Sequence, residues 1–329
     1  MSLIKCPEKK RSIWDMSRKE TVPLGQKEKN MKIGIDLGGS HIGLGVIDEK
    51  NNIVEKFDKD FTKEDKDNIK TVIENFIIDK VQELENKYDI ENIGIAVPGI
   101  AKDGVIIRTV NLGIYNYNMA KALEEKLNMK ITIRNDAKCA CIAEYENIIK
   151  NEPELKDSNM LFLTLGTGVG GGFIYNGKLI EGHAFEGYEF GHMIIKENGI
   201  PCKCGKLGCF EKYGSILEYK NRVKQRLNIW QEVNGEPLRK IMNEHIDEIL
   251  DINKQYVKDL SIGISNLINI FEPDLVVLGG GYSHFSYLFE KDLKKELVNS
   301  ALLFNRREDI DIRTAKLGND AGIIGATIY

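Results

Sequence analysis

One local pattern occurs twice in this chain, and the duplication constrains the fold more than any other feature. The first copy joins β-rich runs at 32–36 and 42–47 through the turn Leu-Gly-Gly-Ser. The second joins runs at 160–165 and 173–175 through a longer glycine-rich turn, and the Asn-Gly that follows predicts a hairpin, because both residues tolerate positive φ. The same signals in the same order predict two similar lobes.

The two copies also keep one register. A shift of 128 residues places Asp36 on Thr164 and Gly38 on Gly166. Helix-spaced apolar residues, such as those at 69–88, alternate with short strand-like runs, as in α/β proteins. A length of 329 residues is ordinary for two domains, and 42% hydrophobic residues suit a globular core. We therefore predict an α/β fold of two duplicated lobes with a cleft between them.

Charge and hydrophobicity exclude several classes of protein. The formal net charge of −4 argues against a nucleic-acid partner held by bulk charge. No apolar run approaches the ~18 residues that a membrane-spanning helix needs, so we expect no membrane partner. Residues 1–30 are polar and charged without a secretory pattern. We predict a flexible leader there and a cytoplasmic protein.

Glycine-rich turns can bind phosphate, because the missing Cβ lets backbone N–H groups approach an anion. Three such turns occur, at 36–40, 166–172 and 279–281. The second also has the spacing of the dinucleotide-binding fingerprint, but a hairpin follows it where the fingerprint needs a helix, so we reject that interpretation. A single glycine turn is more often a tight hairpin. Two in matching positions favour phosphate sites on opposite walls of a cleft.

Three of the six cysteines are clustered. Cys202, Cys204 and Cys209 flank glycines that permit a tight knuckle, and His192 lies ten residues before the first of them. In a cytoplasmic protein, clustered cysteines indicate metal binding before a disulfide. Three thiolates and an imidazole form a closed tetrahedral set that suits Zn²⁺ and leaves no open position for catalysis. We predict a structural zinc site; the alternative is a group of reduced cysteines that are neighbours by chance.

Together these motifs resemble the ROK family of sugar kinases, within the actin-like, sugar kinase and Hsp70 ATPase superfold. The resemblance extends over about 31–329. It rests on Asp-Leu-Gly-Gly-Ser at 36–40, Asn-Asp-Ala at 135–137, the glycine turn at 165–172, Glu-Phe-Gly-His at 189–192, the cysteine cluster through Glu211, and Gly-Asn-Asp-Ala-Gly at 318–322. It implies an N-terminal lobe of 31–136 plus 317–329, and a C-terminal lobe of 137–316 that carries the zinc site.

The resemblance implies that ATP with Mg²⁺ and a hexose bind between the lobes, and that Asp36 orients the Mg²⁺. The implied nucleotide-binding residues lie in the three glycine turns: Asp36, Gly38, Gly39, Ser40, Gly166, Thr167, Gly168, Gly170, Gly279, Gly280 and Gly281. Sugar hydroxyls need carboxylate and amide partners. The implied sugar-binding residues are Asn111, Asn135, Glu189, His192 and Glu211.

Asp136 has two interpretations. It follows a strand-like run and begins a helical pattern, so the residues alone favour a helix cap. The resemblance implies instead that Asp136 is the catalytic base for a sugar hydroxyl, with O6 as the first choice. Tyr188 stands where the family has glycine, before Glu189, and 182–187 is bulkier than the family's usual run. These differences bear on which sugar is bound.

We therefore expect an ATP-dependent hexose kinase, similar to glucokinase, that phosphorylates glucose at the 6-hydroxyl. Kinases for N-acetylmannosamine, N-acetylglucosamine or another hexose are alternatives of the same class. The family also includes sugar-responsive repressors, but the 35 residues before Asp36 are too few for a helix-turn-helix domain, so that alternative is a regulator without one. A catalytically silent sugar-binding protein is a third alternative, which Asp136 argues against. The resemblance also implies a homodimer.

Overall fold

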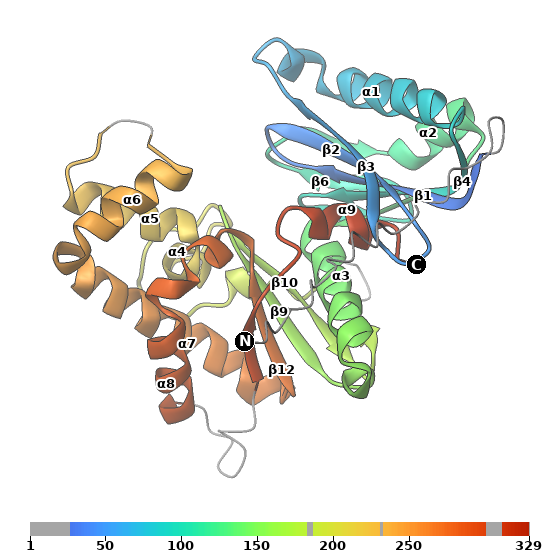
Figure 1. Ribbon diagram of the computed structural model, residues 1–329. Helices are drawn as coiled ribbons and strands as arrows, with labels where there is room; N and C mark the ends of the chain where they lie inside the picture. Colours follow the sequence, from blue (N-terminus) through green and yellow to red (C-terminus); the bar gives the residue numbers. More distant parts are fainter. Residues whose placement is uncertain (1–26, 183–186, 231–232, 301–310, 329) are drawn as a thin grey trace, which may run out of the picture.

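The computed structural model describes residues 27–182, 187–230, 233–300 and 311–328, and two five-stranded sheets organise it, one in each lobe (Figure 1). The first sheet has the order β3 (Ile53–Asp60), β2 (His41–Ile47), β1 (Glu28–Leu37), β4 (Tyr88–Val97) and β8 (Ile131–Asn135). The second has the order β11 (Lys178–Leu179), β10 (Val169–Tyr175), β9 (Met160–Leu165), β12 (Leu275–Gly279) and β13 (Asp311–Thr314).

Strand direction follows the same plan in both sheets. The two outer pairs on one side are antiparallel, β1 with β2 and β2 with β3, and so are β9 with β10 and β10 with β11. The two pairs on the other side are parallel, β1 with β4 and β4 with β8, and likewise β9 with β12 and β12 with β13. The predicted α/β fold with two related lobes is therefore confirmed.

The shift of 128 residues also relates the observed strands of the two sheets. It carries β2 onto β10 residue for residue, and it carries Leu37, the end of β1, onto Leu165, the end of β9. The predicted hairpin is also present, with φ of 48° at Asn176 and 73° at Gly177. The second glycine turn is shorter than predicted, because Gly170 and its neighbours belong to β10 and pair with β9.

Helices cover the outer faces of the sheets. In the first lobe α1 (Ile69–Leu84) and α2 (Met119–Leu127) share a hydrophobic core with the first sheet. In the second lobe the helices are α4 (Glu211–Gly214), α5 (Ile216–Arg226), α6 (Gly235–Glu244), α7 (Leu250–Phe271) and α8 (Glu290–Ser300). Helix α6 begins at Gly235, directly after its N-cap Asn234. Pro237 lies in its first turn, where a missing N–H costs little.

Two helices cross between the lobes and meet there, α3 (Asp136–Asn151) and α9 (Asp320–Ala326) (Figure 1). Helix α3 leaves the last strand of the first sheet and packs against β9 and β10, whereas α9 leaves the last strand of the second sheet and packs against β1 and β4. Glycine is required at the contacts. A Cβ on Gly94 would lie 1.7 Å from the carbonyl oxygen of Ala326, and one on Gly325 would lie 1.8 Å from that of Cys139.

Smaller elements complete the structure. A three-stranded sheet of β5 (Ile100–Lys102), β6 (Val105–Thr109) and β7 (Ile114–Tyr117) lies between β4 and α2 in the chain. The short 3₁₀ helices are η1 (Asp65–Asn68), η2 (Pro153–Leu155), η3 (Phe190–His192), η4 (Ile246–Ile249), η5 (Gly280–His284) and η6 (Ser286–Leu288). Strand β1 begins at Glu28, before the predicted start of the lobe at Met31, and residues 1–26 of the predicted leader lie outside the described residues. Among the helices described, none has the length and apolar character needed to cross a membrane.

Candidate active site

A cleft of about 510 Å³ lies between the lobes, and the first two glycine turns, at 36–40 and 166–172, line it. This volume is ordinary for a small-molecule site. Most of the residues that the sequence singled out meet here: Asp36, Gly38, Gly39, Ser40, Asn111, Asn135, Asp136, Gly166, Thr167, Gly168, Gly170, Glu189 and Glu211. Segments that are far apart in the sequence therefore contribute to one space.

Asp36 lies at the end of β1, on the cleft-facing edge of the first sheet. Burial raises the pKa of its carboxyl to about 6, against the opposing effect of the Lys56 ammonium. The start of α9 approaches this carboxyl closely, because a Cβ on Gly322 would lie only 2.7 Å from Cγ of Asp36. Asp36 is therefore a half-buried acid that lies between its own strand and a crossover helix.

Asp136 is the first residue of α3, and it lies at the same edge of the sheet, since β8 runs parallel to β4 and β4 to β1. Its Oδ1 accepts hydrogen bonds from the backbone N–H of Ala137 at 2.8 Å and from the amide of Asn135 at 3.2 Å. Burial raises the pKa of Asp136 to about 7, and the negative charges of Asp36 and Glu189 add to this effect. A general base works best with a pKa near the working pH.

The helix cap is Asn135, not Asp136. The side chain of Asn135 accepts from the backbone N–H of Lys138 at 3.1 Å, and its backbone is extended, as expected at an N-cap. The capping interpretation of Asp136 was therefore wrong. Since both hydrogen bonds named above use Oδ1 of Asp136, its Oδ2 is the oxygen left for a ligand in the cleft.

The second glycine turn is packed against Glu211. Oε2 of Glu211, at the start of α4, accepts from the backbone N–H of Val169 at 3.2 Å, and a Cβ on Gly168 would lie 2.4 Å from this oxygen. A Cβ on Gly166, in contrast, would have no heavy atom within 4 Å. The turn is thus fixed on one side and open to the cleft on the other.

Asn111 and Asn135 are two amide side chains near the first glycine turn. Asn111 contacts the turn itself, and Asn135 contacts Gly99, just after β4. Asn111 follows β6, and its Cβ would lie 3.1 Å from a Cβ on Gly39. The side-chain amide of Asn135 donates to the carbonyl oxygen of Gly99 at 2.9 Å. These contacts place two amide side chains in the wall of the cleft beside Asp136.

Tyr188 lines the cleft beside Glu189 in a backbone conformation that favours glycine. Its φ is 65°, which costs a residue with a side chain about 1–2 kcal/mol. The ring packs against Phe190 and Phe271, with centroids 6.1 and 6.2 Å apart. This φ explains why the resemblance leads one to expect glycine here. Of the bulkier segment that precedes Tyr188, residues 183–186 lie outside the described residues.

A second, smaller cavity of about 160 Å³ shares Asp36, Asp136 and Thr164 with the cleft. Gly280 lines it, with a φ of 67°. Gly279 and Gly281 line neither of these two cavities: Gly279 ends β12, and a Cβ on Gly281 would contact Ile216. Only the middle residue of the third glycine turn therefore reaches the site.

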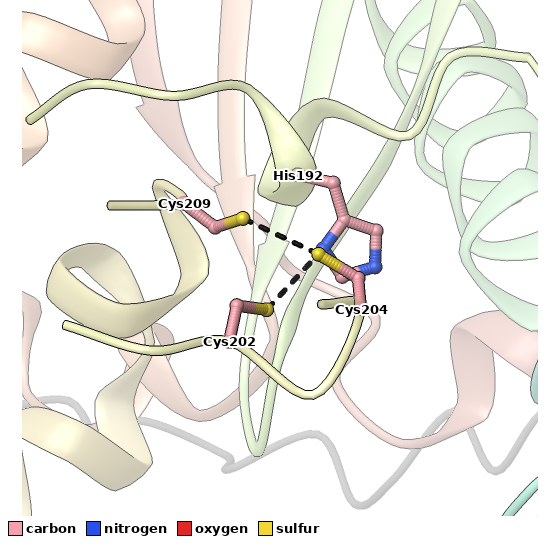
Figure 2. Close-up of side chains that lie close together, drawn as sticks. All are labelled: His192, Cys202, Cys204 and Cys209. Carbon is pink, nitrogen blue, oxygen red and sulfur yellow. Dashed lines mark hydrogen bonds between the residues drawn. The ribbon is translucent and has the colours of Figure 1, made fainter. Parts of the chain in front are cut away.

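The cysteine cluster forms a compact group of donor atoms (Figure 2). Each residue of the cluster offers one ligand atom, and these four atoms lie within 4.8 Å of one another. The residues are His192, Cys202, Cys204 and Cys209. Sγ of Cys202 is 3.7 Å from Nδ1 of His192, and Sγ of Cys204 is 3.5 Å from that of Cys209. A Zn–S bond of about 2.3 Å places the sulfurs of a tetrahedral site about 3.8 Å apart. The cluster can therefore hold zinc.

Glycine and backbone pairing shape this knuckle. The backbone of Gly208 has a φ of 78°, and a Cβ there would lie 1.7 Å from the carbonyl oxygen of Lys196. Isolated bridges join Ile194 to Cys209 and Pro201 to Leu207. His192 is the last residue of η3 (Phe190–His192), and its Nδ1 lies near Sγ of Cys202. It does not line the cleft, and its implied second contact, with the sugar, stays a prediction.

Several residues of the cleft were missed in the sequence. Thr164 lines both cavities, and the 128-residue shift, which superimposes it on Asp36, was the signal for it. His41 lines the cleft next to Ser40, where its ring packs over Gly38. Lys138 lines it from the first turn of α3, where burial lowers the pKa of its ammonium. No local pattern distinguishes His41 or Lys138 from ordinary surface residues.

Known proteins share the fold of this chain and part of its sequence. The family model described as the ROK family matches residues 32–329, nearly the whole chain. This chain belongs to the ROK family. The match includes both glycine turns, Asp136 and the cysteine cluster, and it confirms the resemblance on which the sequence-based expectations rested.

Among similar proteins, a glucokinase of Halalkalibacterium halodurans is 30% identical over 89% of this chain and 92% of its own length. An N-acetyl-D-glucosamine kinase of Vibrio parahaemolyticus is also 30% identical, over 90% of this chain and 98% of its own. Among solved structures, a ROK family glucokinase from Streptomyces griseus in complex with glucose and AMPPNP is 26% identical, with a TM-score of 0.73 over 90% of this chain and 98% of that one.

Proposed function

We propose that this protein is a sugar kinase that transfers the γ-phosphoryl group of ATP to a hexose, with the 6-hydroxyl of glucose as the leading acceptor. The observation that carries the proposal is the position of Asp136. Its carboxylate faces a cleft that both glycine turns line, and burial holds its pKa near 7. Phosphoryl transfer to an alcohol needs few other groups, because positioning and charge stabilisation supply most of the catalysis.

In the proposed reaction Oδ2 of Asp136 accepts the proton of the sugar hydroxyl as the oxygen attacks the γ-phosphorus. The bond from the γ-phosphorus to the bridging oxygen breaks, and ADP leaves with that oxygen. The hydrogen bonds from Asn135 and Ala137 to Oδ1 hold the carboxylate in one orientation during the transfer. A base held in this way loses little conformational freedom at the moment of reaction.

The nucleotide would lie along the two glycine turns, where backbone N–H groups can face its phosphates. The open space beside Gly166 supports this placement, because no heavy atom would lie within 4 Å of a Cβ there, which leaves room for an anion. Mg²⁺ bound with ATP would neutralise part of the charge of the phosphates. Asp36 is a carboxylate in the same cleft, so its oxygens suit a hard cation, either directly or through water.

The sugar would lie on the other side of Asp136. Asn111, Asn135, Glu189 and Glu211 offer the amide and carboxylate partners that sugar hydroxyls need, and all four line the cleft. A Zn²⁺ ion held by Cys202, Cys204, Cys209 and His192 would stabilise the segment between Glu189 and Glu211. Since four protein ligands leave no open position, its proposed role is structural.

The Vibrio relative favours a second candidate of the same class, an N-acetylhexosamine kinase. The test is ADP release by the purified protein with ATP and Mg²⁺, against glucose, mannose, N-acetylglucosamine and N-acetylmannosamine. We expect turnover with one of these sugars at a kcat/KM at least about tenfold above the others. Sugar binding without turnover on any of them would favour a sugar-sensing regulator. The proposed homodimer is tested separately by light scattering at several protein concentrations.

A further inference from the structure

Glu144 is a buried carboxylate that the proposed reaction does not use. It lies on α3, two turns beyond Asp136, and only 1% of its surface is exposed. Burial raises its pKa, and two backbone hydrogen bonds oppose that effect. A buried carboxylate is costly unless it is hydrogen-bonded, so its partners indicate why it is there.

Both partners of Glu144 belong to the crossover between the lobes. Its Oε1 accepts from the backbone N–H of Leu317 at 2.7 Å, and its Oε2 accepts from that of Lys316 at 3.1 Å. These residues lie between the end of β13 and the start of α9, where the chain passes from the second lobe to the first. One side chain of α3 thus holds two consecutive amides of the segment that leads into α9.

This segment continues directly to the carboxylate of Asp36. Gly318 and Asn319 line the smaller cavity together with Glu144, Asp36 and Asp136. One helical turn further on, the close approach of Gly322 to Asp36 described above fixes α9 against the end of β1. The same cavity is therefore closed by α3, which carries Asp136, and by the crossover that contacts Asp36.

We propose that Glu144 is a positioning residue that fixes Asp36 and Asp136 relative to each other, by fastening the 316–317 crossover to the helix that carries the base. The inference rests on the proposed function. Glu144 itself touches neither substrate in this scheme. It acts through the crossover, and a loosened crossover would let the phosphate side of the cleft shift against the base. Misplacement by about 1 Å can cost on the order of 100-fold in rate.

The test compares Glu144→Ala and Glu144→Gln with Glu146→Ala as the matched control. Glu146 is on the same helix, is only half-buried, and lines neither the cleft nor the smaller cavity. ADP release gives kcat and both KM values, hydrogen exchange reports the amides of 316–319, and thermal melting reports the fold. We expect Glu144→Ala to lower kcat by about tenfold or more, with the sugar KM changed less than about twofold and faster exchange at 316–317. Glu146→Ala should match the wild type.

Glu144→Gln keeps one oxygen acceptor but turns an amide NH₂ toward the other N–H, so we expect a kcat between those of the wild type and Glu144→Ala. If Glu144→Ala does not fold, Glu144→Gln decides alone. A folded Glu144 variant with wild-type kcat would overturn this inference while leaving the kinase function intact. A lower melting temperature with unchanged kcat would likewise reduce Glu144 to a purely structural residue. A wild type without turnover on any sugar would overturn the proposed function, and this inference with it.

Discussion

Asp36 and Asp136 face the same cleft from the same edge of the first sheet, and the charge of Asp36 raises the pKa of Asp136. The two carboxyls come from the ends of β1 and β8, separated in the sheet by β4. Burial raises the pKa of both, to about 6 for Asp36 and about 7 for Asp136. Neither group is therefore a fully ionised surface acid at neutral pH, and the site should respond to pH and to loss of either charge.

The first prediction concerns the pH dependence of catalysis. Asp136 must be ionised to accept a proton, and its pKa in the folded protein is about 7. We therefore expect kcat/KM for the sugar to rise with pH and to level off above about pH 8. The measurement is ADP release at saturating ATP·Mg²⁺ across this range. A profile that is flat from about pH 6 to 8 would contradict the role of Asp136 as the base.

The second prediction concerns stability. A folded-state pKa above the unfolded value means that the native protein binds more protons, so stability falls as pH rises from about 4 to about 7. Asp136→Asn removes the half-buried charge and keeps an oxygen that can accept from the N–H of Ala137. We expect this variant to melt at a higher temperature than the wild type at pH 8, with the difference shrinking toward pH 4. Equal melting temperatures at pH 8 would show that the ionised carboxylate of Asp136 does not destabilise the folded protein.

The third prediction separates the fold from phosphate binding. A methyl group at Gly166 meets no heavy atom within 4 Å, and no positive φ forbids it. We expect Gly166→Ala to fold with an unchanged melting temperature and to raise the KM for ATP by about tenfold, because the methyl would occupy the space of a phosphate. Gly325→Ala is the opposite case: its Cβ would overlap the carbonyl oxygen of Cys139, so it should destabilise the fold by about 1–3 kcal/mol or more. An unchanged KM for ATP in Gly166→Ala would remove this turn from the nucleotide site.

The fourth prediction concerns zinc. Cys204→Ser should lose bound zinc and weaken sugar binding together, because the metal would hold the segment that carries Glu189 and Glu211. Lys203→Ser is the matched control, since Lys203 is an exposed neighbour that offers no ligand. Elemental analysis and calorimetric titration with the preferred sugar measure the two properties. Full sugar affinity in a zinc-free Cys204→Ser protein would contradict the proposed structural role of the metal.

Local sequence signals predicted the duplicated strands well. The strands and turns of each copy depend on neighbouring residues, so the 128-residue shift alone is enough to align β1 with β9 and β2 with β10. The residues alone favoured a helix-capping role for Asp136. Only the family resemblance indicated that Asp136 is the catalytic base. The error in the second glycine turn has a physical cause: Gly170 pairs with Thr164, and strand pairing overrides the flexibility of glycine.

Long-range contacts were beyond such prediction. Glu144 is separated from Leu317 by 173 positions, and nothing near either residue indicates that a carboxylate meets that N–H. The ring of Tyr188 packs on Phe271, which is far away along the chain, and no local pattern indicates that contact. Features of this kind depend on tertiary packing rather than on a motif.

The most direct test of Asp136 as the catalytic base compares ADP release by the wild type and by Asp136→Asn, with ATP·Mg²⁺ and the preferred sugar. Calorimetry on the same proteins measures sugar binding as the control for an intact cleft. We expect Asp136→Asn to bind the sugar within about threefold of the wild type but to lose at least about 100-fold in kcat. An Asp136→Asn protein that retains wild-type turnover would contradict this role of Asp136.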